Sequence, residues 1–181
     1  MGKFTLMTNS AYLDYQGDDE VEIAKVVDSE TREEIMYVYY DKNLYRKSGY
    51  HICIDIYEYN DGSGDYAVGK VDDYHRDCLF AQPKVFLSMM LHEYGHYING
   101  DLTAEGQTNE SIKAERTRCV AEGRVMEIER KADAFAISHV GKNTFMRSMD
   151  YLIKKRRERN DFAMKLAIQE FELRKKEAKK L

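Results

Sequence analysis

One run of largely apolar residues constrains the fold of this chain more than any other feature. It follows Pro83, the only proline, and reads KVFLSMMLHEYGHYIN, with Gly100 just beyond it. Proline favours the first turn of a helix and glycine favours its end, so the run predicts a single helix. Apolar side chains occupy most of its circumference, which is typical of a helix that is buried on all sides. The other elements of the fold must therefore pack around this helix.

The residues before this helix predict β-strands. Tyr, Val and Ile, which favour strands, gather in residues 34–40 (EIMYVYY), 51–59 (HICIDIYEY) and 65–71 (DYAVGKV). Ile52, Ile54 and Ile56 occupy alternate positions in residues 51–59, which is the pattern of a half-buried strand. Residues 60–64 read NDGSG, and these residue types favour turns. We therefore expect a β-hairpin over residues 51–71.

The residues after the buried helix predict further helices. One helical stretch runs from about Asn109 to His139, with Gly123 as a point of division and Gly141 as its end. Another begins near Thr144 and continues into the basic C-terminal residues. The sequence thus predicts an α+β fold with a β-rich N-terminal half, a buried helix, and further helices.

The net charge of −4 hides an uneven distribution along the chain. Residues 154–181 carry a net charge of +6, and the rest carries −10. We therefore expect one domain in residues 1–153, followed by a basic amphipathic helix in residues 154–181. This helix has two apolar stripes on opposite faces, one with Phe162, Leu166 and Leu173 and the other with Met164, Ile168 and Phe171. It could pack on the domain through one stripe, bind a partner or a second copy through both stripes, or contact nucleic acid through the KKRR of residues 154–157. The first interpretation is favoured, and the acidic net charge gives no reason to expect nucleic acid.

The composition indicates a compartment and excludes some classes of protein. No stretch is apolar for long enough to form a transmembrane helix. The cysteines (Cys53, Cys78 and Cys119) are widely spaced and odd in number, so they do not suggest a disulfide framework. A reducing compartment follows, and we expect a cytoplasmic protein that is not associated with a membrane.

The buried helix carries the pattern H-E-x-x-H at residues 92–96. Histidines four apart lie on the same face of a helix, so His92 and His96 can bind one zinc ion from a rigid support. Glu93 projects about 100° further round the helix, where it can contact a water molecule on the metal without binding the metal itself. This placement suits a general base. The alternative is a pair of core histidines, but burying ionisable side chains without a partner charge is costly.

A catalytic zinc site needs a third protein ligand and keeps a fourth position open. A third histidine six residues after the second is excluded, since Leu102 stands there. A glutamate from a later helix is the other possibility, and residues 127–136 read EIERKADAFA. The alanine and aspartate that follow Glu129 favour it over Glu122 and Glu127, which remain alternatives.

The residues around Glu129 also predict how the two helices meet. Asp133 lies one turn further on the same face, where it can accept the second imidazole N–H of a ligand histidine. Ala132 and Ala136 flank this face, and their small side chains permit close approach. Gly95 is the matching small residue on the first helix, where glycine costs about 1 kcal/mol relative to alanine.

Residues 92–101 (HEYGHYINGD) and 129–133 (ERKAD) together resemble the HExxH…ExxAD pattern of the gluzincin metallopeptidases. The HtpX-type and ImmA/IrrE-type peptidases are the most similar groups, and the subfamily stays open. The resemblance implies a zincin-like fold and hydrolysis of peptide bonds, with Glu93 as the catalytic base. Carried over by position, the zinc ligands are His92, His96 and Glu129.

The sequence therefore predicts a zinc-dependent endopeptidase that acts on a protein or peptide substrate. An edge strand of the β-rich half could bind an extended peptide, although the pattern does not identify the strand. The alternative is a non-catalytic zincin-like module that keeps zinc for stability and binds or regulates a partner through its basic C-terminal helix. Glu93 argues against it, because a purely structural zinc site does not need a base. The residue that would stabilise the oxyanion stays open among His75, Tyr94, Tyr97, Arg147 and Tyr151.

Overall fold

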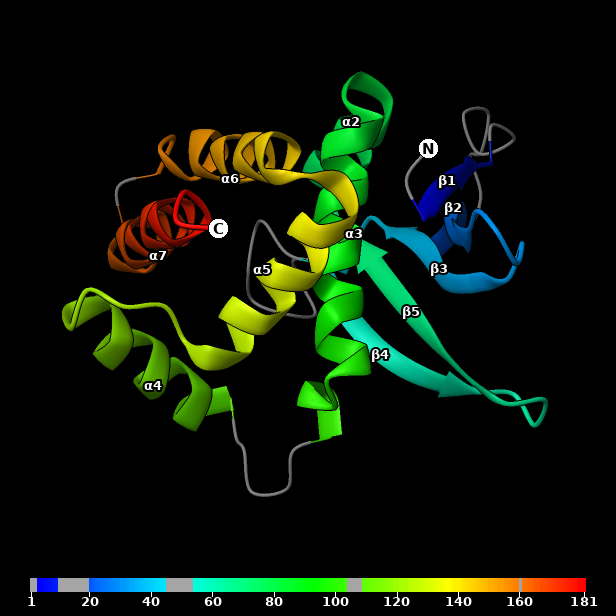
Figure 1. The fold of residues 1–181 in the computed structure, drawn as a ribbon, viewed down its shortest axis with the longest axis horizontal. Coiled ribbons are helices and arrows are strands. Elements are labelled where there is room, and N and C mark those ends of the chain that lie inside the picture. Colours follow the sequence, from blue (N-terminus) through cyan, green and yellow to red (C-terminus); the bar gives the residue numbers. More distant parts are fainter. Residues whose placement is uncertain (1–2, 10–19, 45–53, 104–108, 160) are drawn as a thin grey trace.

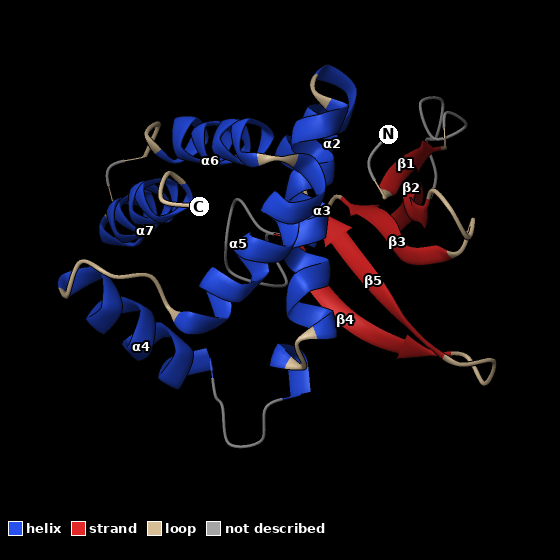
Figure 2. Cartoon of the chain, in the orientation of Figure 1, coloured by secondary structure: helices blue, strands red, loops and turns tan. Residues whose placement is uncertain are grey.

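The computed structural model describes residues 3–9, 20–44, 54–103, 109–159 and 161–181 (Figure 1). In this part of the chain the strands come first and the helices follow, which confirms the predicted α+β class (Figure 2). The strands are β1 (Phe4–Thr8), β2 (Glu20–Asp28), β3 (Glu34–Asp41), β4 (Ile54–Asn60) and β5 (Asp65–Val71). The helices are α2 (Asp73–Ala81), α3 (Pro83–Ile98), the short 3-10 helix η2 (Asp101–Thr103), α4 (Asn109–Ala121), α5 (Glu127–Val140), α6 (Lys142–Arg156) and α7 (Phe162–Ala178). None of the described helices is long and apolar enough to cross a membrane.

The strands form one sheet in the order β1-β2-β3-β5-β4. Neighbours are antiparallel except β3 and β5, which run parallel. β4 and β5 form the predicted hairpin over residues 54–71, and the turn between them contains Gly62 and Gly64 at positive φ. The rest of the predicted hairpin, residues 51–53, lies outside the described residues. β4 is an edge strand, since among the described strands it pairs only with β5.

Helix α3 lies at the centre of the fold, as its apolar circumference predicts. It spans Pro83–Ile98, and Gly100 follows with a φ of +75°. Figure 1 shows α3 between the sheet on one side and α5 and α6 on the other. Phe86, Met90 and Leu91 of α3 are fully buried and belong to a hydrophobic core that the sheet and the helices share.

Glycines divide the helices that follow. Gly123, at a φ of +70°, separates α4 from α5, and Gly141, at +81°, ends α5, both as predicted. Helix α6 begins near the predicted position and enters the basic tail, but it ends at Arg156. The expected entry into the tail is therefore confirmed, but the single helix expected over residues 154–181 is divided between the end of α6 and α7. The physical reason is a new cap: the side chain of Asp161 accepts a hydrogen bond from the backbone N–H of Met164 at 3.0 Å and starts α7.

Helix α7 packs on the rest of the fold through one of its two apolar stripes. Met164 and Phe171 are buried, and Phe171 and Ala178 belong to the hydrophobic core. Phe162, on the other stripe, is 74% exposed. This arrangement matches the favoured interpretation of the basic tail, in which it packs on the domain. The predicted boundary between residues 153 and 154 falls inside α6.

Candidate metal centre

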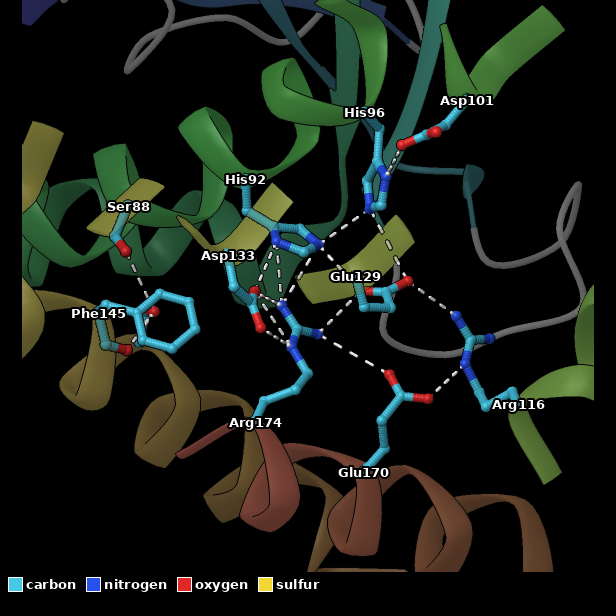
Figure 3. A network of polar contacts seen from close by, with 11 residues as sticks. Ser88, His92, His96, Asp101, Arg116, Glu129, Asp133, Phe145, Glu170 and Arg174 are labelled. Carbon is cyan, nitrogen blue, oxygen red and sulfur yellow. Dashed lines mark hydrogen bonds and ion pairs between the residues drawn. The ribbon is translucent and has the colours of Figure 1, made fainter. Parts of the chain in front are cut away.

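Helices α3 and α5 approach each other closely because both carry small residues where they meet. Ala132 and Ala136 of α5 are fully buried. A Cβ atom on Gly95 of α3 would lie 3.0 Å from the Cα atom of Ala132, which is closer than ordinary van der Waals contact. Glycine at this position therefore permits the close approach, in agreement with the prediction from sequence. Figure 3 shows that side chains of the same two helices converge, with His92 and His96 from α3 and Glu129 and Asp133 from α5.

His92, His96 and Glu129 meet at this centre. The Nε2 atoms of the two histidines lie 3.1 Å apart, and Glu129 Oε2 lies 3.2 Å from His92 Nε2. Glu129 Oε1 lies 3.8 Å from His96 Nε2. All three side chains are buried, and one ligand atom from each lies within 4.8 Å of the others. These three residues could therefore hold a metal ion.

The two alternative glutamates lie away from this centre. Glu127 pairs with Arg130 at 2.5 Å, and Glu122 pairs with Arg124 at 2.5 Å. Both glutamate side chains are about half exposed, and their partners are exposed as well. Of the three candidates that the sequence offers, the structure brings Glu129 to the histidines.

A carboxylate holds each histidine ring in position. Asp133 Oδ1 lies 2.9 Å from His92 Nδ1, and Asp101 Oδ2 lies 2.9 Å from His96 Nδ1. Each Nδ1–H can donate to its carboxylate, which leaves both Nε2 atoms for the centre. The sequence predicts the place of Asp133 but does not single out Asp101. Asp101 reaches His96 because Gly100 turns the chain at the end of α3 in a left-handed conformation.

A pocket of about 380 Å³ opens beside the centre. Its polar lining includes the three potential ligands and Glu93, whose side chain is half-buried. Ile54, the first residue of edge strand β4, also lines it. Its apolar lining comes from α3, α6 and α7: Met89, Met149, Leu152, Met164 and Phe171. A molecule in this pocket would therefore meet Glu93 and the potential ligands together.

Three further charged residues, which the sequence patterns do not single out, complete the centre (Figure 3). Arg174 of α7 donates from Nε and Nη2 to Asp133 at 2.9 and 2.5 Å, and its Nη1 lies 3.3 Å from Glu129 Oε2. Arg116 of α4 lies 3.2 Å from Glu129 and 2.5 Å from Glu170. Glu170 lies four residues before Arg174 on α7, a spacing that indicates pairing but not burial.

These charges shift the pKa values at the centre. Burial and the charge of Arg174 lower the pKa of His92, but hydrogen bonds to Asp133 and Glu129 outweigh them and raise it to about 9. Burial raises the pKa of Glu129, but Arg174 and the two imidazoles hold it well below its usual range. The pKa of Asp133 is lowered because the charge of Arg174 and the hydrogen bond to His92 outweigh burial. Glu129 and Asp133 are therefore both ionised carboxylates at neutral pH.

The residues that the sequence leaves open as oxyanion donors have other contacts in the structure. Each has a different partner: Arg147 with Gln82, Tyr151 with Tyr74, Tyr94 with Tyr97, and His75 with Asp72. His75 also lines the pocket, but Asp72 Oδ1 lies 2.7 Å from its Nδ1 and fixes the ring at the start of α2. Tyr94, Tyr97, Arg147 and Tyr151 do not line the pocket.

The donor set at the centre could hold a metal ion. Imidazole nitrogens and carboxylate oxygens are common metal ligands, and a carboxylate on each Nδ1 is the usual support of a metal-binding histidine. The chain matches no protein family, no curated protein and no solved structure with which it was compared.

Proposed function

We propose that the protein is a zinc-dependent endopeptidase with a zincin-like active site. The observation that carries the proposal is the convergence of His92, His96 and Glu129 in one pocket with Glu93. A purely structural zinc site usually fills all four positions with protein ligands. Three potential ligands beside a candidate base favour catalysis over a structural role.

The residues at the centre suit zinc and the chemistry that zinc supports. Imidazole nitrogen and carboxylate oxygen are common zinc ligands. Bound zinc would supply a Lewis acid that brings the pKa of a coordinated water molecule to about 7. Asp133 and Asp101 would hold the protons of the two imidazoles on Nδ1, so that both Nε2 atoms stay available as ligands.

Glu93 carries the proton in the proposed reaction. It accepts a proton from the attacking water as the water oxygen bonds to the carbonyl carbon and an electron pair moves onto the carbonyl oxygen. It then gives this proton to the peptide nitrogen as the C–N bond breaks and the carbonyl forms again. One water molecule is consumed, and the products are a carboxylic acid and an amine.

Strand β4 offers a surface for an extended peptide. It lies at the edge of the sheet, packs beside α3, and places Ile54 in the lining of the pocket. An extended chain that pairs with a strand edge gains main-chain hydrogen bonds that do not depend on its sequence. We therefore propose a peptide or an extended protein segment as the substrate, with β4 as the strand that orients it.

Zinc content and proteolysis of the wild type and of Glu93→Gln test this function. A peptide library of mixed sequence supplies the substrates, and mass spectrometry follows cleavage. We expect Glu93→Gln to keep its zinc and to lose cleavage by about 10²–10⁴-fold, because the ligands remain and the base is gone. Equal cleavage by the two proteins would refute the mechanism. Zinc binding without any cleavage by the wild type would favour the non-catalytic module.

Glu129→Gln tests the third ligand, and Glu127→Gln is its matched control on the same helix. An amide oxygen is a weaker zinc ligand than a carboxylate, so we expect Glu129→Gln to lower zinc occupancy. Glu127 pairs with Arg130 at the surface, and its substitution should leave zinc occupancy unchanged. Full occupancy in Glu129→Gln would exclude Glu129 as a ligand.

A further inference from the structure

Helix α7 extends Arg174 into the metal centre from the side opposite α3 (Figure 3). Its side chain is only 4% exposed, and it lines the same pocket as Glu93. A guanidinium group keeps its positive charge at any physiological pH, so this residue supplies a permanent cation beside Glu129. The proposed proton transfers do not use this cation.

The guanidinium group is fixed in orientation by Asp133. Nε and Nη2 of Arg174 bind the two carboxylate oxygens of Asp133 side by side, at 2.9 and 2.5 Å. Such a paired contact sets the plane of the group as well as its position. The guanidinium carbon also lies 5.3 Å from the centre of the Phe171 ring, which packs against it. Arg174 is therefore ordered before any substrate arrives.

The remaining nitrogen, Nη1, lies between the third ligand and Glu170. It is 3.3 Å from Glu129 Oε2 and 3.8 Å from Glu170 Oε1, which are longer separations than those that Nε and Nη2 make to Asp133. Nη1 therefore gives up little when it turns a hydrogen toward a better acceptor in the pocket. A developing negative oxygen in the pocket would be such an acceptor, because a hydrogen bond between charged groups is strongest at about 2.7–2.9 Å, closer than either carboxylate now lies to Nη1.

We propose that Arg174 donates a hydrogen bond from Nη1 to the oxygen of the scissile carbonyl as negative charge develops on it. This inference rests on the proposed peptidase function and supplies its oxyanion donor. Arg174 transfers no proton, and the proton balance of the reaction stays with Glu93. Removing one donor of this kind typically lowers kcat by about 10²–10³-fold.

Arg174→Met tests the inference with two measurements on zinc-loaded protein. The first is kcat and KM on a cleaved peptide. The second is the calorimetric Kd for a phosphinic analogue of that peptide, whose tetrahedral anion imitates the charged oxygen. We expect full zinc content, a kcat lower by about 10²–10³-fold, a KM changed by less than about threefold, and an analogue affinity that falls with kcat/KM.

Lysine in place of Arg174 covers the case in which the methionine variant does not fold. Arg174→Lys keeps a cation for the buried carboxylates but cannot both hold Asp133 and reach the substrate, so kcat should still fall by about 10-fold or more. Lys175→Gln is the control on the same helix: Lys175 pairs with Asp150 at 2.6 Å on α6, and activity should stay within about twofold.

The remaining outcomes separate this inference from its rivals. Loss of zinc in both Arg174 variants would make Arg174 a positioning residue for the ligands and would overturn the proposal. A rise in activity would show that Arg174 blocks the pocket, and an unchanged affinity for the phosphinic analogue would show that it does not meet the oxyanion. If the wild type cleaves no peptide, the proposed function itself fails; if it cleaves and the variants equal it, only this inference fails.

Discussion

Substituting Gly95 with alanine probes the close contact between α3 and α5, because two effects of known size oppose each other there. Alanine favours a helix over glycine by about 1 kcal/mol. The new Cβ would lie 3.0 Å from the Cα atom and 3.4 Å from the Cβ atom of Ala132. Forcing a methyl group into a packed site costs about 1–3 kcal/mol, and backbone atoms cannot rotate out of the way as a side chain can. The free energy of unfolding should therefore fall by about 1 kcal/mol.

The same substitution should weaken zinc binding. His92 and His96 lie on α3 and Glu129 lies on α5, so parting the helices by a few tenths of an ångström moves the ligands apart. A zinc site tolerates deviations of only about 0.2 Å in its ligand distances. Urea denaturation of the metal-free protein measures the change in the free energy of unfolding, and competition with a chelator measures the change in zinc affinity. A more stable Gly95→Ala protein with unchanged zinc affinity would refute the packing argument.

A double-mutant cycle with Ala132→Gly shows whether the effect arises at this contact. Removing the Cβ of Ala132 relieves the 3.4 Å contact but not the 3.0 Å contact to its Cα atom. Gly95→Ala should therefore cost less in the Ala132→Gly background, with a coupling of at least about 0.5 kcal/mol. Strictly additive effects would place the strain elsewhere.

Two further predictions follow from the charges around the histidines. The pKa of His92 is about 9 in the folded, metal-free protein and about 6.5 in the unfolded chain. Its contribution to stability is therefore complete below pH 6.5 and falls by about 3 kcal/mol as the pH rises through 9. Urea midpoints of the metal-free protein between pH 6 and pH 10 measure this fall, and a flat profile would contradict it. Asp133→Asn and Asp101→Asn should each weaken zinc affinity by about 10–100-fold, because each removes the acceptor that orients a ligand ring. Chelator competition measures both, and wild-type affinity in either variant would show that its carboxylate does not orient the ligand.

The parts of the site that the sequence predicts are those built from local spacing. His92, Glu93 and His96 share one helix, so their relation depends on helix geometry alone. Glu129 also follows from a local pattern, since the alanines beside it mark the face that packs closely on another helix. The buried character of α3 and the β4–β5 hairpin follow from hydrophobic periodicity in the same way.

The parts that the sequence does not predict depend on how distant elements pack. Arg174 stands in a strongly basic stretch, where positive charge usually indicates a solvated surface, yet the packing of α7 buries it against Asp133. Arg116 contacts Glu129 from α4, and the sequence of this helix has no apolar face that would indicate how it packs. The sequence does not predict the helix break before Asp161 either, because an aspartate caps a helix only where the chain enters that helix from a non-helical conformation. Periodicity identifies the face that a helix buries, but it does not identify which carboxylate on another helix will pair with a cation on that face.

The order of His96 and Glu129 along the chain would make a bound metal ion a cross-link as well as a part of the proposed reaction. His96 and Glu129 lie on either side of α4, so a metal ion bound to both closes residues 96–129 into a loop. A covalent cross-link over a loop of this length lowers the entropy of the unfolded chain by an amount worth about 3–4 kcal/mol. A metal bridge acts in the same sense but can be removed, and α4 with Arg116 lies inside the loop that it closes. The supply of metal would then set how long the folded protein survives as well as whether it can act.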